Sequence, residues 1–226
     1  MTEADWLASN PIAVLSFLQD QGWQSERKCR LFAVTCCRRI WYIMSDARSR
    51  SAVEAAERYA DGLTDLAQLG ASRNLAYEAY DMVAYSNLPP AKALLSLAAC
   101  AAFAVTLHDP RLAPGWVSAM VLNVVSSHQV SSPGPVEAEW AAHCDLLRDI
   151  FGNPFRPLSL DPSWLTSSVV ALAEGIYAER AFDRLPILAD ALQDAGCDNP
   201  EVLDHCREPG PHVRGCFVVD LLTGRT

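Results

Sequence analysis

Apolar side chains recur every three or four residues along almost the whole chain, which is the spacing of one face of an α-helix. Runs that alternate apolar and polar residues, the pattern of a half-buried strand, are almost absent. Residues 217–222 are apolar enough for a strand, but Pro211 stands where a first helical residue belongs and the spacing up to Leu221 is helical. The sequence therefore predicts an all-α fold, a multi-helix bundle.

Polar side chains that can accept hydrogen bonds from backbone N–H groups mark several helix starts. Asn10, Ser25 and Asp46 each precede a run with helical spacing, and the run after Ser25 extends to about residue 45. We expect helices over residues 2–8, 11–19, 26–45, 47–60, 64–70, 72–85, 90–107, 114–126, 135–151, 163 or 166 to 181, 184–195, 200–207 and 211–222.

The most apolar segment is the alanine-rich run over residues 93–107. Its 15 residues fall short of the roughly 20 that a helix needs to cross a bilayer, so we expect a buried core helix and no membrane association. The start of the chain is acidic and lacks the basic and apolar stretches of a secretory signal. These features predict a soluble, cytoplasmic protein.

Two segments rich in turn-forming residues interrupt the helical pattern. The clearer one is Ser-Ser-Pro-Gly-Pro at residues 131–135, and residues 152–162 hold three prolines. The first break divides an N-terminal helical bundle, residues 1–130, from a smaller C-terminal helical unit, residues 135–226. The same break is also compatible with a loop inside one continuous domain, and the sequence leaves both interpretations open.

Eight cysteines are present, and in a large helical chain without a secretory signal we expect free thiols or metal ligands rather than disulfides. Three of them and two histidines fall within residues 197–216. On the predicted last helix, His212 and Cys216 are four residues apart and share one face. These residues can form a tetrahedral zinc site, in which His205 can replace one ligand, although core packing is the simpler interpretation. The four candidate ligands are Cys197, Cys206, His212 and Cys216.

Core packing is the competing interpretation of this segment. No Cys-x-x-Cys pair, the strongest sequence sign of zinc, is present, and free cysteines often act as small buried hydrophobes. Cys216 lies on an apolar stripe with Phe217 and Leu221. The sequence leaves open whether these residues hold zinc, structurally or catalytically, or only pack.

A carboxylate and a histidine stand one helical turn apart at Glu139 and His143, and Asp145 and Asp149 follow. Such a pair can bind a metal inside a helical bundle, but the two Glu-x-x-His motifs of a di-metal site are absent. We therefore interpret these residues as a solvated acidic face. The nucleophile-elbow, zinc-protease and dinucleotide motifs are absent as well, which favours a protein that is not an enzyme.

The formal net charge is −9, and an acidic chain is a poor sequence-independent binder of nucleic acid. A basic cluster lies on the predicted helix after Ser25 and has the charge to contact RNA, DNA or an acidic partner. A solvated face with ordinary helix-surface ion pairs is the simpler interpretation. The cluster consists of Arg27, Lys28, Arg30, Arg38 and Arg39.

Long motifs at the two ends of the chain are specific enough to indicate kinship. They are Thr-Glu-Ala-Asp-Trp-Leu at residues 2–7, Arg-Leu-Phe-Ala-Val at 30–34, Cys-Cys-Arg-Arg at 36–39, Leu-Arg-Asp-Ile-Phe-Gly-Asn-Pro-Phe-Arg-Pro at 147–157, Tyr-Ala-Glu-Arg-Ala-Phe at 177–182 and His-Val-Arg-Gly-Cys-Phe at 212–217. In these motifs the chain resembles a large bacterial family of no known activity. The resemblance implies a bacterial origin, but no cofactor and no catalytic residue.

Three functions are compatible with the sequence. The absence of enzyme motifs, the many short helices and the six tryptophans favour a non-catalytic helical module that binds another protein. One alternative is a zinc-binding protein that uses the C-terminal cysteines and histidines. The other is a nucleic-acid-associated regulator that uses the basic helix over residues 27–39.

Overall fold

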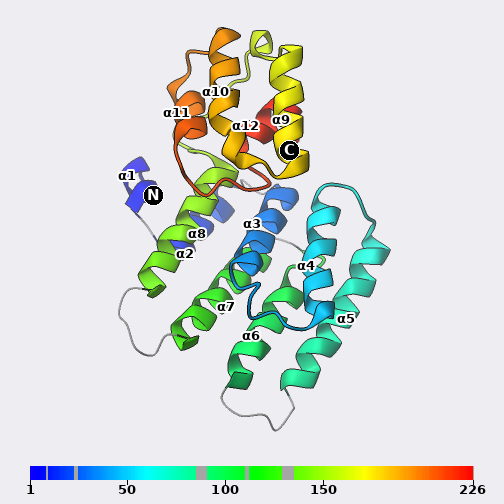
Figure 1. Cartoon of the computed structure of the whole chain (residues 1–226). Coiled ribbons are helices and arrows are strands. Elements are labelled where there is room, and N and C mark those ends of the chain that lie inside the picture. The colour runs from blue at the N-terminus through cyan, green and yellow to red at the C-terminus, as the bar shows by residue number, and fades with distance from the viewer. Residues whose placement is uncertain (9, 23–24, 85–90, 110–111, 129–134, 226) are drawn as a thin grey trace. The chain divides into compact units, whose positions relative to one another are not determined.

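The computed structural model describes residues 1–8, 10–22, 25–84, 91–109, 112–128 and 135–225. Over these ranges the chain forms helices and no strand, which confirms the all-α fold (Figure 1). The predicted turn at residues 131–134 lies outside the described residues, as do residues 85 and 90 at two predicted helix ends. The α-helices are α1 (Glu3–Ala8), α2 (Pro11–Asp20), α3 (Glu26–Arg39), α4 (Ala47–Ala60), α5 (Leu66–Ala84), α6 (Ala91–Ala104), α7 (Ala113–His128), α8 (Pro135–Phe151), α9 (Ser167–Glu179), α10 (Leu185–Asp194), α11 (Pro200–Arg207) and α12 (Phe217–Thr223).

The predicted N-cap residues hold the starts of their helices. The side chains of Asn10, Ser25 and Asp46 each accept a hydrogen bond from a backbone N–H of the first turn, at 3.0, 3.3 and 2.8 Å. Of the two predicted starts for α9, Thr166 is the N-cap, and it accepts a hydrogen bond of 3.3 Å. These helix starts follow from local hydrogen-bonding chemistry, which the sequence shows directly.

Two predicted boundaries between helices are wrong. The sequence predicts a break between residues 70 and 72, but α5 runs unbroken through Gly70. A glycine inside a helix costs only about 1 kcal/mol, and α5 packs along both α4 and α6, which offsets that cost. The helix α3 ends at Arg39 rather than near residue 45, because residues 40–43 form turns.

The predicted helix over residues 211–222 is wrong in its first half. Only α12 is helical, and residues 211–216 form a loop. Within this loop Gly215 has φ +95°, a left-handed conformation that glycine adopts without strain. His212 and Cys216 therefore do not share a helix face, and any meeting of their side chains depends on the loop.

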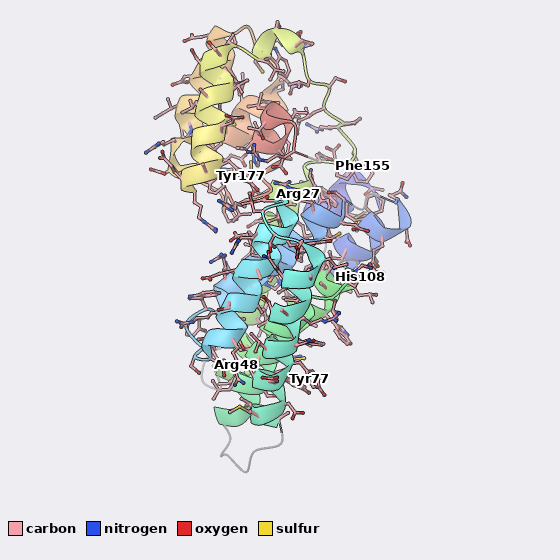
Figure 2. The ribbon with its side chains drawn as sticks, turned by 90° about the vertical axis from the view of Figure 1, so that its right-hand side faces the viewer. Arg27, Arg48, Tyr77, His108, Phe155 and Tyr177 are labelled. Atoms are coloured by element: carbon pink, nitrogen blue, oxygen red, sulfur yellow. The ribbon has the colours of Figure 1, made fainter. Side chains whose placement is uncertain are left out.

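The helices form two compact units, residues 1–144 and residues 145–226, so the division lies within α8. The sequence predicts either a boundary near residue 133 or one continuous domain. In the first unit α4 packs on α5, α5 on α6 and α6 on α7, while α3 contacts both α4 and α7. Arg48 at the start of α4 and Tyr77 on α5 lie at the same end of this bundle (Figure 2).

The alanine-rich helix α6 lies in the core of the first unit, as the sequence predicts. Ala98, Ala101 and Ala102 are at most 1% exposed. The buried guanidinium of Arg30 donates to the carbonyl oxygens of Val105 and Leu107 at 2.6 and 3.1 Å, just beyond the end of α6. Within the described residues, no helix is long and apolar enough to cross a membrane.

The second unit is built from α9 to α12 and the end of α8. The helix α9 packs against α10 and α12, and α10 packs against α11. Its apolar core includes three of the four predicted zinc ligands, Cys197, Cys206 and Cys216, each at most 2% exposed. This packing brings the end of α8, the end of α11 and the loop before α12 to one place.

Candidate metal centre

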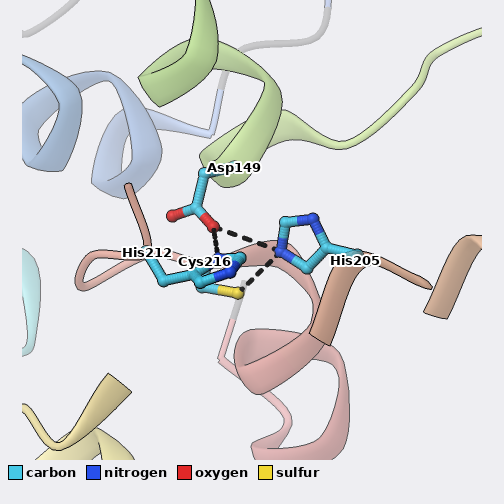
Figure 3. A group of neighbouring side chains, drawn as sticks. All are labelled: Asp149, His205, His212 and Cys216. Atoms are coloured by element: carbon cyan, nitrogen blue, oxygen red, sulfur yellow. Dashed lines mark hydrogen bonds and ion pairs between the residues drawn. The ribbon is translucent and has the colours of Figure 1, made fainter. Parts of the chain in front are cut away.

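Four side chains of the second unit direct ligand atoms at one point (Figure 3). A carboxylate oxygen of Asp149, ring nitrogens of His205 and His212 and the sulfur of Cys216 all lie within 4.8 Å of one another. Asp149 comes from α8, His205 from α11, and the other two from the loop before α12. All are donor types that bind transition metals in proteins.

Asp149 is held by both of its carboxylate oxygens. Oδ2 accepts a hydrogen bond of 3.0 Å from the backbone N–H of Val213. Oδ1 lies 2.8 Å from Nδ1 of His212 and 3.1 Å from Nε2 of His205. Burial by itself raises the pKa of Asp149, but the hydrogen bonds and charges of the two histidines outweigh it and lower that pKa. The inward-facing oxygen, Oδ1, is thus held in place as part of an anionic carboxylate, the form that binds metal ions.

His212 has distinct roles for its two ring nitrogens. Nε2 lies 3.0 Å from the backbone carbonyl oxygen of Glu208, which can only accept a hydrogen bond, so Nε2 is the donor. Nδ1 is then left facing the carboxylate of Asp149. Burial lowers the pKa of His212, but the hydrogen bond to Asp149 and its negative charge outweigh it and raise that pKa. Either a proton or a metal ion can therefore occupy the inward side of Nδ1.

His205 is held in place by ring contacts. Its ring centroid lies 4.3 Å from that of Phe217 and 4.7 Å from that of His212. Phe217 in turn packs on the turn that ends α8, where Gly152 has φ +70° and a Cβ atom on this residue would lie 3.2 Å from the ring. Gly152 thus permits both the left-handed turn and the close approach of Phe217 to the backbone.

Cys216 supplies the sulfur from the position just before α12. Its side chain is fully buried. Burial, and then the negative charge of Asp149, raises the pKa of the Cys216 thiol well above its usual value. A metal ion would have to displace that proton, because the thiolate is the form that binds metals.

A Cys–His–Asp catalytic triad is the competing interpretation of these contacts. In a triad the nucleophile and the carboxylate bind opposite nitrogens of the imidazole. Here Sγ of Cys216, at 3.3 Å, and Oδ1 of Asp149, at 3.1 Å, approach the same nitrogen, Nε2 of His205. One N–H cannot serve both acceptors well, whereas a cation between the three atoms binds all of them. The geometry favours a metal site.

The structure brings together only part of the predicted ligand set. His212 and Cys216 meet as expected, and His205, the predicted substitute, is with them. Cys197 and Cys206 lie outside the converging group, in the apolar core. Burial, and then the charge of Asp149, raises the pKa of the Cys206 thiol to about 12.

Sequence reasoning missed Asp149, which it assigned to a solvated acidic face. That interpretation is wrong, because Asp149 is 2% exposed, Glu139 8% and His143 0%. A usable signal was present: Asp149 lies three residues after Leu146 and beside Ile150, both buried. A carboxylate inside an apolar helical stripe needs a partner.

A cavity of about 320 Å³ adjoins the group. Three of the four converging residues line it, and Cys216 does not. Charged residues of both signs also line it. The lining residues are Asp145, Arg148, Asp149, His205, Glu208, Pro209, Gly210, Pro211 and His212.

A second buried cluster lies in the first unit, around His143. Nδ1 of His143 is 2.8 Å from Oγ of Ser118, and Nε2 is 3.2 Å from Oε1 of Glu139. Both oxygens of Glu139 accept hydrogen bonds from Arg39, at 2.5 and 2.7 Å. Burial raises the pKa of Glu139, but the hydrogen bonds and charges of Arg39 and His143 outweigh it and bring that pKa to about 2.

Several arginines of the predicted basic face are paired with acids. Arg38 donates to Glu57 at 2.6 Å and Arg27 to Asp61 at 3.3 Å, in addition to the pair of Arg39 with Glu139. Arg30 is buried against the end of α6. Much of the positive charge of this helix is therefore compensated within the first unit.

Comparison of the chain with family models, curated proteins and solved structures gives no match. The resemblance to a bacterial family stays a prediction.

Proposed function

We propose that the second unit is a metal-binding module that holds one zinc ion through Asp149, His205, His212 and Cys216. The observation that carries this proposal is the convergence of one oxygen, two nitrogens and one sulfur within 4.8 Å. The zinc function predicted from the C-terminal cysteines and histidines is kept. In its ligand set, Asp149 and His205 replace two cysteines.

Three of the distances between ligand atoms suit a tetrahedral ion after small side-chain shifts. Bonds of about 2.0 Å to oxygen and nitrogen and 2.3 Å to sulfur put neighbouring ligand atoms about 3.3–3.6 Å apart. Oδ1 of Asp149 lies 2.8 and 3.1 Å from the two imidazole nitrogens, and Sγ of Cys216 lies 3.3 Å from Nε2 of His205. Each of these three pairs needs to separate by about 0.5 Å or less to admit zinc, and the other pairs of ligand atoms, which lie within 4.8 Å, need to close to the tetrahedral spacing.

The groups around the ligands also suit a metal site. Metal-binding histidines usually donate their second ring N–H to a carbonyl or carboxylate, and metal-binding carboxylates usually accept a hydrogen bond elsewhere. His212 donates to the Glu208 carbonyl, and Asp149 accepts from the Val213 N–H. These contacts aim Nδ1 and Oδ1 inward.

The donor set favours zinc over magnesium and calcium. A thiolate and two imidazoles are poor ligands for those hard cations, which prefer oxygen, whereas zinc accepts sulfur, nitrogen and oxygen together. A bound ion would join the end of α8, the end of α11 and the loop before α12. Because unfolding separates these segments, metal binding would stabilise the unit.

The test is metal analysis of the purified full-length chain, followed by removal of the metal and reloading with Co²⁺. We expect about one zinc ion per chain, and an intense sulfur-to-cobalt absorption band on reloading. Cys216→Ala should abolish that band. Cys197→Ala, a buried cysteine outside the group, is the matched control and should keep it. A protein that gives no such band with Co²⁺ would refute the proposal.

Docking of another protein is a second candidate function, favoured by exposed tryptophans. Trp116 on α7 is 56% exposed and Trp140 on α8 is 40% exposed, and tryptophan is a common anchor of protein interfaces. Immobilised protein should capture a partner that the double variant Trp116→Ala, Trp140→Ala does not. Equal capture by both would contradict this role.

A further inference from the structure

The candidate metal site lies beside the cavity, so a ligand in the cavity would be close to a bound ion. Asp149, His205 and His212 border the cavity, while Cys216 is fully buried and does not line it. The side chains of His205 and His212 are 15% and 8% exposed. An ion among the four ligand atoms would therefore have the cavity on the side that the histidines border.

Zinc sites of this kind can accept an additional ligand. Zinc has no geometric preference from its d-electrons and can expand from four to five ligands. Closed structural sites prevent this by surrounding the ion with protein. Here a cavity of about 320 Å³ reaches three of the ligand residues. That volume is at the lower end for small-molecule sites, so the molecule that supplies the additional ligand atom must be small.

The charges around the cavity restrict the ligand further. Arg148 lines the cavity, and its guanidinium attracts an anion. Asp145 and Glu208 line the same cavity, and Asp145 accepts a hydrogen bond of 2.9 Å from Arg148. Because two carboxylates repel multiply charged anions, a monoanion fits this cavity better than a phosphate ester.

On the basis of the proposed zinc function, we propose that the bound ion presents a coordination position to this cavity and binds there the carboxylate of a small monoanionic ligand. One carboxylate oxygen would bind the metal, while the Arg148 guanidinium supplies a second positive charge nearby. Oxygen is a donor that zinc accepts, and guanidinium matches the planar carboxylate. Without the ligand, the same position would take water.

The experiment uses the Co²⁺-loaded full-length protein with thiocyanate and acetate as probes. Both monoanions should change the visible cobalt spectrum saturably, while the sulfur-to-cobalt band persists. Arg148→Ala should weaken acetate binding about five-fold, an effect of the size expected for one nearby charge. Arg156→Ala removes an equal charge from an ion pair with Glu201, outside the cavity lining, and should leave acetate binding unchanged.

The outcomes separate the two proposals. Absence of the sulfur-to-cobalt band would refute the metal site itself. A band that persists in a spectrum indifferent to both anions would leave the metal site standing and overturn the open coordination position. Loss of the band as anion is added would mean that the anion strips the cobalt, which also overturns it. Equal acetate binding by Arg148→Ala and Arg156→Ala would overturn the role of Arg148.

Discussion

The two buried carboxylate–histidine clusters contain similar residues but differ in how their negative charge is balanced. In the first unit Glu139 faces the guanidinium of Arg39, a permanent cation, and His143 lies between Glu139 and a serine hydroxyl. In the second unit Asp149 faces two imidazoles, and one of these also faces a buried thiol. The first cluster already contains its positive charge. The second is a set of metal-ligand atoms that a cation would complete.

The difference shows that residue types alone do not distinguish a structural network from a ligand site. Ser118 and His143 are both fully buried, so substrate cannot reach them. Three residues of the second cluster border a cavity. We therefore interpret the first cluster as a network that fixes α3, α7 and α8 together, and the second as the candidate metal site.

The largest effect is expected when one histidine in each cluster is replaced by alanine. His205→Ala should lower zinc affinity on the order of 100-fold or more, since it removes a direct ligand. His143→Ala should leave zinc affinity unchanged and raise amide hydrogen exchange in α3, α7 and α8, because it opens a cavity in that core. Competition with a zinc chelator and hydrogen exchange measure the two effects. Equal loss of zinc in both variants would remove the distinction.

The next largest effect is expected on the stability of the first unit when the Glu139 carboxylate is replaced by an amide. Glu139→Gln should destabilise the first unit by about 2 kcal/mol, because Arg39 loses its anionic partner in a mostly buried place. Hydrogen exchange in α3 and α8 measures this cost. Asp145→Asn is the control, since Asp145 is 49% exposed and its ion pair contributes little. A cost below that of the control would show that the network does not stabilise the unit.

Acid should affect the first cluster through Glu139. Its pKa is about 2 in the folded protein, below the value of 4.5 expected for the free side chain. A lowered folded pKa contributes stability that is complete above about pH 4.5 and is lost as the pH falls toward 2. The stability difference between wild type and Glu139→Gln should thus shrink over this range. A difference independent of pH would contradict the ion pair.

The smallest effect concerns the glycine that supports the metal site from a distance. Gly152→Ala places a methyl group in a left-handed turn, at about 1–2 kcal/mol, and pushes against Phe217, which packs on His205. Gly62→Ala has the same backbone cost, with φ +69° and no atom within 4 Å of the added carbon. Zinc affinity should fall several-fold in the first variant only. Equal affinities would exclude a role for Phe217 in holding His205.

Local chemistry determined the parts of the fold that the sequence predicted. The N-caps at Asn10, Ser25 and Asp46 and the buried alanine-rich helix α6 depend on neighbours within a turn or on hydrophobic spacing, and both can be read along the chain. The same information suggested His205, His212 and Cys216 as metal ligands, because they are close in sequence.

Tertiary structure decided how those residues meet. Asp149 precedes His205 by more than fifty positions, and only the packing of the second unit brings its carboxylate to the histidines. The predicted helix face of His212 and Cys216 does not exist; the loop with Gly215 at φ +95° takes its place. Helical spacing could not reveal this loop. A loop that packs on a folded core is stabilised by contacts with segments distant in the sequence, and local helix propensity does not report those contacts.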